Sequence, residues 1–328
     1  TMRRTGYGFL WIPWIAVAIS FACLGCGDDG GASGTGGDGG MPGTGGSGGT
    51  AGMAGTGGSG GTGAFEETYP VNQTFWHQGF KVEIGDAVYA GSEPDIFGNQ
   101  DITVTLEATF TNEGDDNWSL GSDLVLVTPS GTINPLFGGI PNVPGGLDVS
   151  GEISFRVDES FDINTAYLLI GSGDEQQARV PLGANAGELI ALEPREPPVS
   201  GAVNLTMLDM TFIRATLRYD DPVNHRQSPD GKLLLTLYFD ATSRRSGNWS
   251  LFPQDFSLAL PGGSNVGADG ALLRPLQGSP AGVDTQGLYV RFLVDDPATG
   301  AYTLRWSGQS AWYAQGDPNP ATFDFELE

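Results

Sequence analysis

The strongest constraint on the fold is an internal similarity between two stretches that lie 131 residues apart. Residues 102–120 read ITVTLEATFTNEGDDNWSL and residues 233–251 read LLLTLYFDATSRRSGNWSL, so the tetrapeptide Asn-Trp-Ser-Leu recurs unchanged. Later segments match in the same order, and the offset between them drifts by only a few residues. Because order and spacing are both kept, the sequence predicts two copies of one structural module.

Each copy has the pattern of short β-strands. In residues 102–110 apolar side chains alternate with Thr and Glu, a period of two that indicates a strand with one buried face. Residues 124–127 and 256–260 are short apolar runs bounded by turn residues, which is typical of strands in a sandwich. No long stretch has helical periodicity. We therefore predict an all-β fold in which each copy is a β-sandwich.

Composition divides the chain into segments. The two modules are expected at residues 65–192 and 201–328, joined by a linker at 193–200 whose three prolines favour an extended backbone. Upstream lies a Gly/Ser/Thr-rich segment at 27–64, in which 20 of the 37 residues from 27 to 63 are glycine. Such a segment cannot bury enough apolar surface to offset its chain entropy, so it is predicted to be a disordered tether.

Residues 1–26 have the pattern of an export signal. Two arginines precede an apolar run at residues 9–22. That run is too short for a transmembrane helix, which needs about 20 residues, but it suits the hydrophobic region of a signal peptide. The segment is therefore expected to direct export rather than to span the bilayer.

The end of this segment, Leu24-Gly25-Cys26, resembles the lipobox of bacterial lipoproteins, in which a cysteine is acylated and becomes the mature N-terminus. The resemblance implies that Cys26 carries the lipid anchor, with Cys23 as the runner-up site. Several acyl chains bury enough CH₂ groups for lasting membrane attachment. It also implies a lipid-anchored protein of the bacterial cell envelope, with the outer membrane favoured because Gly27 follows Cys26. An ordinary cleaved signal with two incidental cysteines is the alternative.

Downstream, a second resemblance is carried by residues 79–84 (GFKVEI), by the strand that ends at Thr111-Asn112, and by a late strand beginning Ala-Tyr. These features resemble the telokin-like, immunoglobulin-fold domains of unknown function found in bacterial surface lipoproteins. The resemblance covers roughly residues 70–185 and 201–328. It implies two tandem immunoglobulin-like β-sandwiches, export from the cytoplasm and no established activity.

Aromatic residues supply the candidate ligand-binding positions. Trp118 and Trp249 lie at equivalent points of the two copies, and we expect both rings to fill the cores. Trp306, Trp312 and Tyr313 flank a short polar stretch and have no counterpart in the first copy. An aromatic cluster beside a loop is a candidate surface for stacking on a sugar or for seating a protein partner. Core packing or a contact between domains is the alternative for these three residues.

Charge limits the class of partner. The chain has 39 acidic and 15 basic residues, a formal net charge of −24, which argues against nucleic acid because a negative surface repels phosphate. Acidic residues cluster at Glu113, Asp115 and Asp116 and, in the second copy, at Asp220 and Asp221. Calcium prefers carboxylate oxygens on loops, so the first three are candidate metal ligands. A solvated acidic surface is the alternative for every cluster.

Together these patterns predict a non-catalytic protein. Two histidines, His77 and His225, occupy unmatched positions of the two copies, so no histidine metal pair is expected. The predicted role is structural, adhesive or binding display of two modules, with the membrane as one partner and an envelope protein or polysaccharide as the other. The alternative is calcium-dependent glycan binding. An enzyme would need paired carboxylates converging in a cleft.

Overall fold

The computed structural model describes residues 63–120, 124–136, 138–205, 208–244, 251–273, 282, 284–307 and 321–328. Within these residues the chain is all-β and β-sandwich-like, and its helical elements are two short 3₁₀ turns, η1 (Ile163–Thr165) and η2 (Pro253–Asp255). The expected all-β class is thus confirmed. In the same part of the chain no helix has the length and apolarity to cross a bilayer. The predicted leader, with Cys23 and Cys26, and nearly all of the tether lie outside the described residues.

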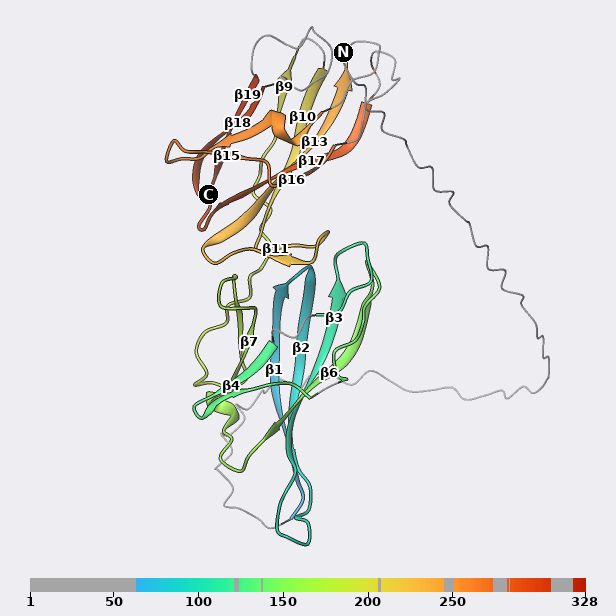
Figure 1. Ribbon diagram of the computed structural model, residues 1–328, viewed down its shortest axis with the longest axis vertical. Helices are drawn as coiled ribbons and strands as arrows, with labels where there is room; N and C mark the ends of the chain where they lie inside the picture. Colours follow the sequence, from blue (N-terminus) through green and yellow to red (C-terminus); the bar gives the residue numbers. More distant parts are fainter. Residues whose placement is uncertain are drawn as a thin grey trace, which may run out of the picture. The chain divides into compact units, whose positions relative to one another are not determined.

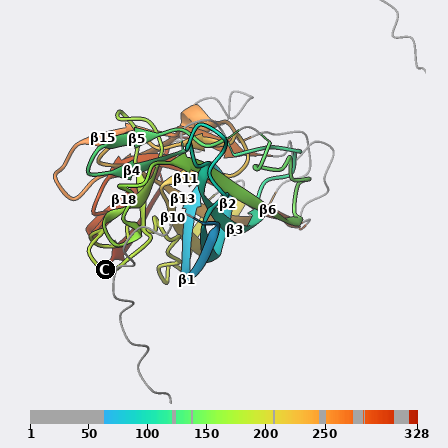
Figure 2. The ribbon, with the colours of Figure 1, turned by 90° about the horizontal axis from the view of Figure 1, so that it is seen from below.

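The first half of the described chain contains two antiparallel sheets of four strands each (Figure 1). The first sheet has the order β1 (Phe65–His77), β2 (Phe80–Gly91), β3 (Ile102–Asn112), β6 (Asp148–Val157). The second has the order β5 (Gly131–Ile133), β4 (Leu124–Thr128), β7 (Tyr167–Ile170), β8 (Ala178–Pro181). Figures 1 and 2 both show β1, β2 and β3 side by side.

The second half contains a five-stranded sheet, a four-stranded sheet and one short strand pair. The five-stranded order is β16 (Gly270–Leu272), β17 (Asp284–Asp295), β13 (Lys232–Ser243), β10 (Leu208–Arg218), β9 (Gly201–Asn204). The four-stranded order is β15 (Asn265–Gly267), β14 (Phe256–Ala259), β18 (Gly300–Trp306), β19 (Ala321–Leu327). The short pair is β11 (Asp220–Asp221) with β12 (Arg226–Gln227), inserted between β10 and β13.

Strand order is the same in the two halves. By position in their sheets, β1-β2-β3-β6 correspond to β9-β10-β13-β17, and β5-β4-β7-β8 correspond to β15-β14-β18-β19. Strands β3 and β13 contain the two similar stretches found in the sequence, at residues 102–112 and 233–243. Equal strand order is the arrangement that a copied module predicts.

Alternating side chains build the cores. Along β3 the buried positions are every second residue from Ile102 to Asn112, as its period of two predicts. One hydrophobic core draws buried side chains from both sheets of the first half, and a second core does so in the second half. The partly buried Tyr219 packs against both cores. The residues just after β10 therefore lie where the two halves meet.

An irregular strand borders the first sheet. β1 is its edge strand, and its pairing with β2 shifts register between Pro70 and Gln73. Asn72, inside this bulge, has a φ of 49°, a left-handed value that asparagine tolerates better than most residues. The outer edge of this sheet is consequently bent within its longest strand.

Candidate functional site

The connection from β10 to β13, residues 219–231, forms a polar cluster where the second half contacts the first. Its turn is closed by Asp221, whose side chain accepts hydrogen bonds from Val223 N at 3.1 Å and from Asn224 Nδ2 at 2.6 Å. His225 completes the turn with a φ of 49°. Aspartate and asparagine favour such turns because their short side chains bond to nearby backbone. We name this segment the junction connection.

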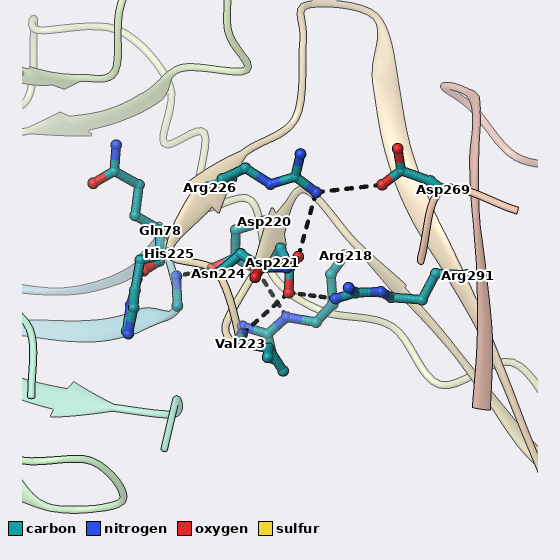
Figure 3. Close-up of polar contacts among 11 residues, drawn as sticks. Gln78, Arg218, Asp220, Asp221, Val223, Asn224, His225, Arg226, Asp269 and Arg291 are labelled. Carbon is teal, nitrogen blue, oxygen red and sulfur yellow. Dashed lines mark hydrogen bonds and ion pairs between the residues drawn. The ribbon is translucent and has the colours of Figure 1, made fainter. Parts of the chain in front are cut away.

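Two buried carboxylates form the centre of the cluster, and three arginines converge on them (Figure 3). Arg218 Nε lies 2.8 Å from Asp220 Oδ1, and Arg291 Nη1 pairs with Asp221 Oδ1. Arg226 Nη2 is 3.5 Å from Asp221 Oδ2. The side chains of Asp220 and Asp221 are 2% and 0% exposed. Burying such charges is costly unless each is paired, and here the arginines pair them.

The same charges reach across to the first half. Asp220 Oδ2 accepts a hydrogen bond from Gly79 N at 2.6 Å, at the turn between β1 and β2. Arg218 Nη2 lies 2.6 Å from Glu113 Oε2, just after β3. A buried, charge-assisted hydrogen bond is stronger than a neutral one. These two contacts therefore join the polar cluster to the first half.

Ionisation in the cluster follows from these partners. Burial alone would raise the pKa of Asp221, but the hydrogen bond from Asn224 and the charge and hydrogen bond of Arg291 outweigh it, so the pKa is lowered. Burial alone would lower the pKa of the Arg218 guanidinium, but the carboxylates of Asp220 and Glu113 outweigh it and raise the pKa. Both groups are therefore held in their charged forms.

A ring stack forms a second contact between the halves. The His225 ring lies parallel to the Trp118 indole, with centroids 4.7 Å apart and planes at 6°. His225 Nδ1 lies 3.1 Å from Gln78 O. A Cβ added at Gly79, whose φ is +80°, would lie only 2.7 Å from Pro222 Cα. The close approach of the two halves thus requires glycine at this turn.

Backbone pairing extends the contact. Gln176 N donates to Ser228 O at 2.9 Å, and Asp230 N donates to Asp174 O at 3.0 Å. The linker residue Arg195 exchanges two backbone hydrogen bonds with Leu217 of β10, at 2.9 and 2.8 Å. The predicted short linker is thus tied to the second half, and the junction connection is tied to the first.

Beside the cluster, a cavity of about 410 Å³ opens on the outer face of the five-stranded sheet. Side chains of β10, β13 and β17 form its floor, and Glu196 of the linker and Glu113 of the first half also line it. Arg214 covers the Tyr238 ring at 4.0 Å, and the Tyr238 and Tyr289 rings meet edge to face at 5.7 Å. The cavity is therefore lined by aromatic rings and by charges of both signs.

The structure separates the predicted metal ligands. Glu113 pairs with Arg218, while Asp115 and Asp116 are exposed on the loop that follows β3. In the described ranges, no three His, Cys, Asp or Glu side chains are grouped to hold a metal ion. Of the three candidate calcium ligands, Glu113 is thus paired with an arginine, and the other two are exposed to solvent.

The predicted aromatic cluster is only partly described. Trp306 is buried at 3% exposure in the second core, the packing alternative that the sequence left open, so its ring faces no solvent. Trp312 and Tyr313 lie outside the described residues, as does Trp249. Trp118 was expected in the first core, but it is 42% exposed and stacks on His225 instead.

Sequence reasoning missed the junction itself. A solvated surface was the alternative for the acidic pair Asp220 and Asp221, and this alternative is wrong because both residues are buried against arginines. A usable signal was present in the arrangement Arg218-Tyr-Asp-Asp, with Arg226 shortly after it. Alternation of opposite charges around a turn favours a local ion-pair network over a repelling acidic patch.

Comparisons with known proteins add little. No family model matches the chain, and no curated protein matches it. A solved structure with some similarity is the crystal structure of a conserved domain protein from Bacillus anthracis. It is 11% identical, covers 80% of this chain and 91% of its own chain, and superposes with a TM-score of 0.25. A TM-score this low identifies neither a fold nor a function.

Proposed function

We propose that this chain is a non-catalytic, lipid-anchored protein of the bacterial cell envelope that displays two immunoglobulin-like modules for structural, adhesive or binding roles. The observation that carries the proposal is the junction, where buried carboxylates serve as structural partners of arginines and of Gly79 N. A chain that holds two β-sandwich-like halves together in this way is suited to presenting them as one unit.

The immunoglobulin-like assignment is supported by strand order. In immunoglobulin sandwiches, strands A, B and E are neighbours in one sheet, and strands C, F and G are neighbours in the other. Strands β2, β3 and β6 fit the first set, and β4, β7 and β8 fit the second, in chain order. The corresponding strands of the second half fit in the same way. We infer a duplicated module at residues 65–192 and 201–328, joined by the linker at 193–200.

The anchor is supported by the leader pattern. The apolar run at residues 9–22 and Leu24-Gly25-Cys26 suit export followed by acylation at Cys26. The Gly-rich segment that follows, at about 37 residues, would have a root-mean-square span of roughly 33 Å. Such a tether would hold the folded modules away from the bilayer.

The test of the anchor uses the two cysteines as a matched pair. The full chain and its Cys26→Ser and Cys23→Ser variants are expressed in a bacterium that processes lipoproteins, with labelled palmitate in the medium. We expect label and membrane association for the wild type and for Cys23→Ser, and loss of both for Cys26→Ser. If Cys26→Ser keeps the label while Cys23→Ser loses it, the assigned site is wrong. If the wild type takes up no label, the anchored function itself is wrong.

A further inference from the structure

The turn between β2 and β3 presents two large apolar side chains to solvent. Ile96 and Phe97 are 93% and 81% exposed, the highest values for large apolar residues in the described part of the chain. Single exposed apolar residues are common on protein surfaces, but these two are adjacent and lie at the end of a hairpin. We name residues 92–101 the β2–β3 tip, which projects from the lower end of the first half in Figure 1.

Hydrogen bonds hold the β2–β3 tip in a defined shape. Ser92 N donates to Asp101 O at 3.0 Å, where the tip begins and ends. Asp95 Oδ1 accepts from Phe97 N at 2.7 Å and from Asn99 N at 2.9 Å. The bonds from Asn99 and Phe97 lower the pKa of Asp95, so the carboxylate that orders the turn stays charged. A loop that is already ordered loses little conformational entropy when its side chains bind.

The β2–β3 tip lies beside the point where the folded chain meets the predicted tether. β1 begins at Phe65, which is paired with Gly91, the last residue of β2. Gln100, within the tip, donates from Nε2 to Gly63 O at 3.3 Å. The Gly-rich segment that leads back to the proposed anchor therefore joins the folded part next to the exposed apolar pair.

The junction lies at the other end of β2. Gly79, whose N–H bonds to Asp220, directly precedes this strand. β2 has 12 residues, which gives it a length of about 40 Å. A flexible tether with a root-mean-square span of roughly 33 Å keeps its attachment point near the bilayer more of the time than a part 40 Å farther away. Anchoring at Cys26 would therefore bring the β2–β3 tip to the bilayer most often.

Charges around the tip select the kind of lipid surface. Glu93 and Asp95 are exposed, and neither has an ion pair within the described residues, whereas Asp101 lies 2.8 Å from Arg156 Nε. Two carboxylates without a basic partner are repelled by anionic headgroups. They are compatible with the outermost ammonium groups of zwitterionic headgroups. The tip therefore suits a zwitterionic surface better than an anionic one.

A protein partner fits the tip less well. The apolar surface consists of two side chains and is bordered by carboxylates, whereas a stable protein interface covers about 800 Å² of each partner. A bilayer requires no matching pocket. Apolar side chains on an ordered support enter the boundary between headgroups and acyl chains directly.

We propose that the β2–β3 tip docks the first half onto a zwitterionic lipid surface, with Ile96 and Phe97 entering the boundary between headgroups and acyl chains. The ordered turn keeps both side chains exposed for this contact, and Glu93 and Asp95 lie among the ammonium groups. The contact gives the modules a preferred orientation on the bilayer, which a flexible tether does not supply. This inference rests on the proposed anchor and adds a second membrane contact to it.

The experiment places a photoreactive group at the tip of an anchored chain. The full chain with Cys23→Ser is produced without export, so that Cys26 is its single thiol, and is coupled to a maleimide lipid in phosphatidylcholine vesicles. Phe97→p-benzoylphenylalanine carries the photoreactive group. The matched control is Ile190→p-benzoylphenylalanine, at a residue that is 48% exposed beside the end of β1 nearest the junction. Because coupling replaces acylation, the test does not depend on processing by a bacterium.

Irradiation should give phosphatidylcholine adducts at position 97, with a yield at least fivefold lower at position 190. Adding Ile96→Asp to the position-97 chain should lower its yield at least fivefold, because a charge would have to enter the acyl boundary. Adding Ile190→Asp to the same chain should leave the yield unchanged. Vesicles of phosphatidylglycerol should give a lower yield than phosphatidylcholine, since they repel the carboxylates beside the apolar pair.

Several results would overturn the proposal. Absence of lipid adducts at position 97 removes it, as do equal yields at positions 97 and 190 or equal yields on the two lipids. Adducts to a second copy of the chain in place of lipid would assign the tip to self-association. Thermal melts separate lost contact from lost folding, and should Ile96→Asp fail to fold, the two positions and the two lipids still decide. Lipid adducts here without palmitate uptake in a bacterium would remove the proposed anchor and keep the lipid contact of the tip.

Discussion

The connection between corresponding strands, β2 to β3 in the first half and β10 to β13 in the second, differs between the two halves. In the first half the chain passes from β2 to β3 through residues 92–101, and in the second it passes from β10 to β13 through residues 219–231. An aspartate orders each turn: Asp95 Oδ1 accepts from Phe97 N at 2.7 Å, as Asp221 Oδ1 accepts from Val223 N at 3.1 Å. Both connections therefore contain the same local turn, in which an aspartate side chain accepts a hydrogen bond from the backbone two residues later.

The surroundings of the two connections differ completely. In the first, Ile96 and Phe97 are 93% and 81% exposed. In the second, Asp220 and Asp221 are buried, and the segment bonds to the other half through Gly79 N. The two halves therefore share a strand order, but in the second half this connection also joins the halves to each other. Substitutions at matched positions of the two connections measure how far this difference extends.

The largest effect is expected at the buried carboxylate. Asp221→Ala leaves the Arg291 guanidinium buried without its partner, so the free energy of unfolding should fall by about 3–5 kcal/mol. The matched control is Asp95→Ala in the exposed connection, where a much smaller loss is expected. Urea unfolding of both variants gives the comparison. Equal losses would show that the two connections do not differ energetically.

The next largest effect is expected from replacing a glycine in the contact between the halves, compared with a glycine of similar φ in the exposed connection. Gly79 and Gly98 have φ values of +80° and +83°, so alanine is strained at both. Only at Gly79 does the added Cβ meet another segment, Pro222 Cα at 2.7 Å. Gly98→Ala should therefore cost about 1 kcal/mol, and Gly79→Ala about 1–3 kcal/mol more, because overpacking adds to strain. A similar cost at both positions, measured by thermal melts, would contradict the close approach.

A smaller effect is expected from the ring stack. A double-mutant cycle of His225→Ala and Trp118→Ala should give a coupling free energy of about 0.5–1.5 kcal/mol, the range for stacked aromatic pairs. The cycle is read from urea unfolding followed by far-ultraviolet circular dichroism, since one substitution removes a tryptophan. Additive losses would mean that the stack contributes nothing to joining the halves.

The smallest effect concerns pH. Because the folded-state pKa of Asp221 is lowered, its ionised form stabilises the fold above the ordinary aspartate value of about 3.9. That contribution is lost as the pH falls through the lower folded value. We expect the stability difference between the wild type and Asp221→Asn to be constant from neutral pH to about pH 5. It should shrink only below pH 4. A difference that already shrinks near pH 6 would contradict the lowered pKa.

Much of the fold could be predicted from local pattern. The alternation in residues 102–110 identified β3 and its buried face because a strand has a period of two. The internal repeat anticipated equal strand order in the two halves, since similar residues in similar order favour the same pairing. These signals lie within short windows of sequence, where pattern is most informative.

The candidate sites could not be predicted in the same way, because their partners are distant in sequence. Asp221 pairs with Arg291, 70 positions away, and Asp220 accepts from Gly79 N, 141 positions away. Nor could the row of Arg214, Tyr238 and Tyr289 be seen without the register of three strands. Two adjacent aspartates are ordinarily expected at the surface. Asp220 and Asp221 are buried because arginines pair with their charges.

The bent outer edge of the first sheet has a consequence for crowded conditions. A long, straight edge strand would offer its unpaired backbone groups to a neighbouring molecule and seed intermolecular sheet growth. In β1 the register shift at Pro70 to Gln73 interrupts that template, and proline itself lacks an N–H to donate. When many copies are packed closely together, pairing between molecules through this edge is therefore disfavoured.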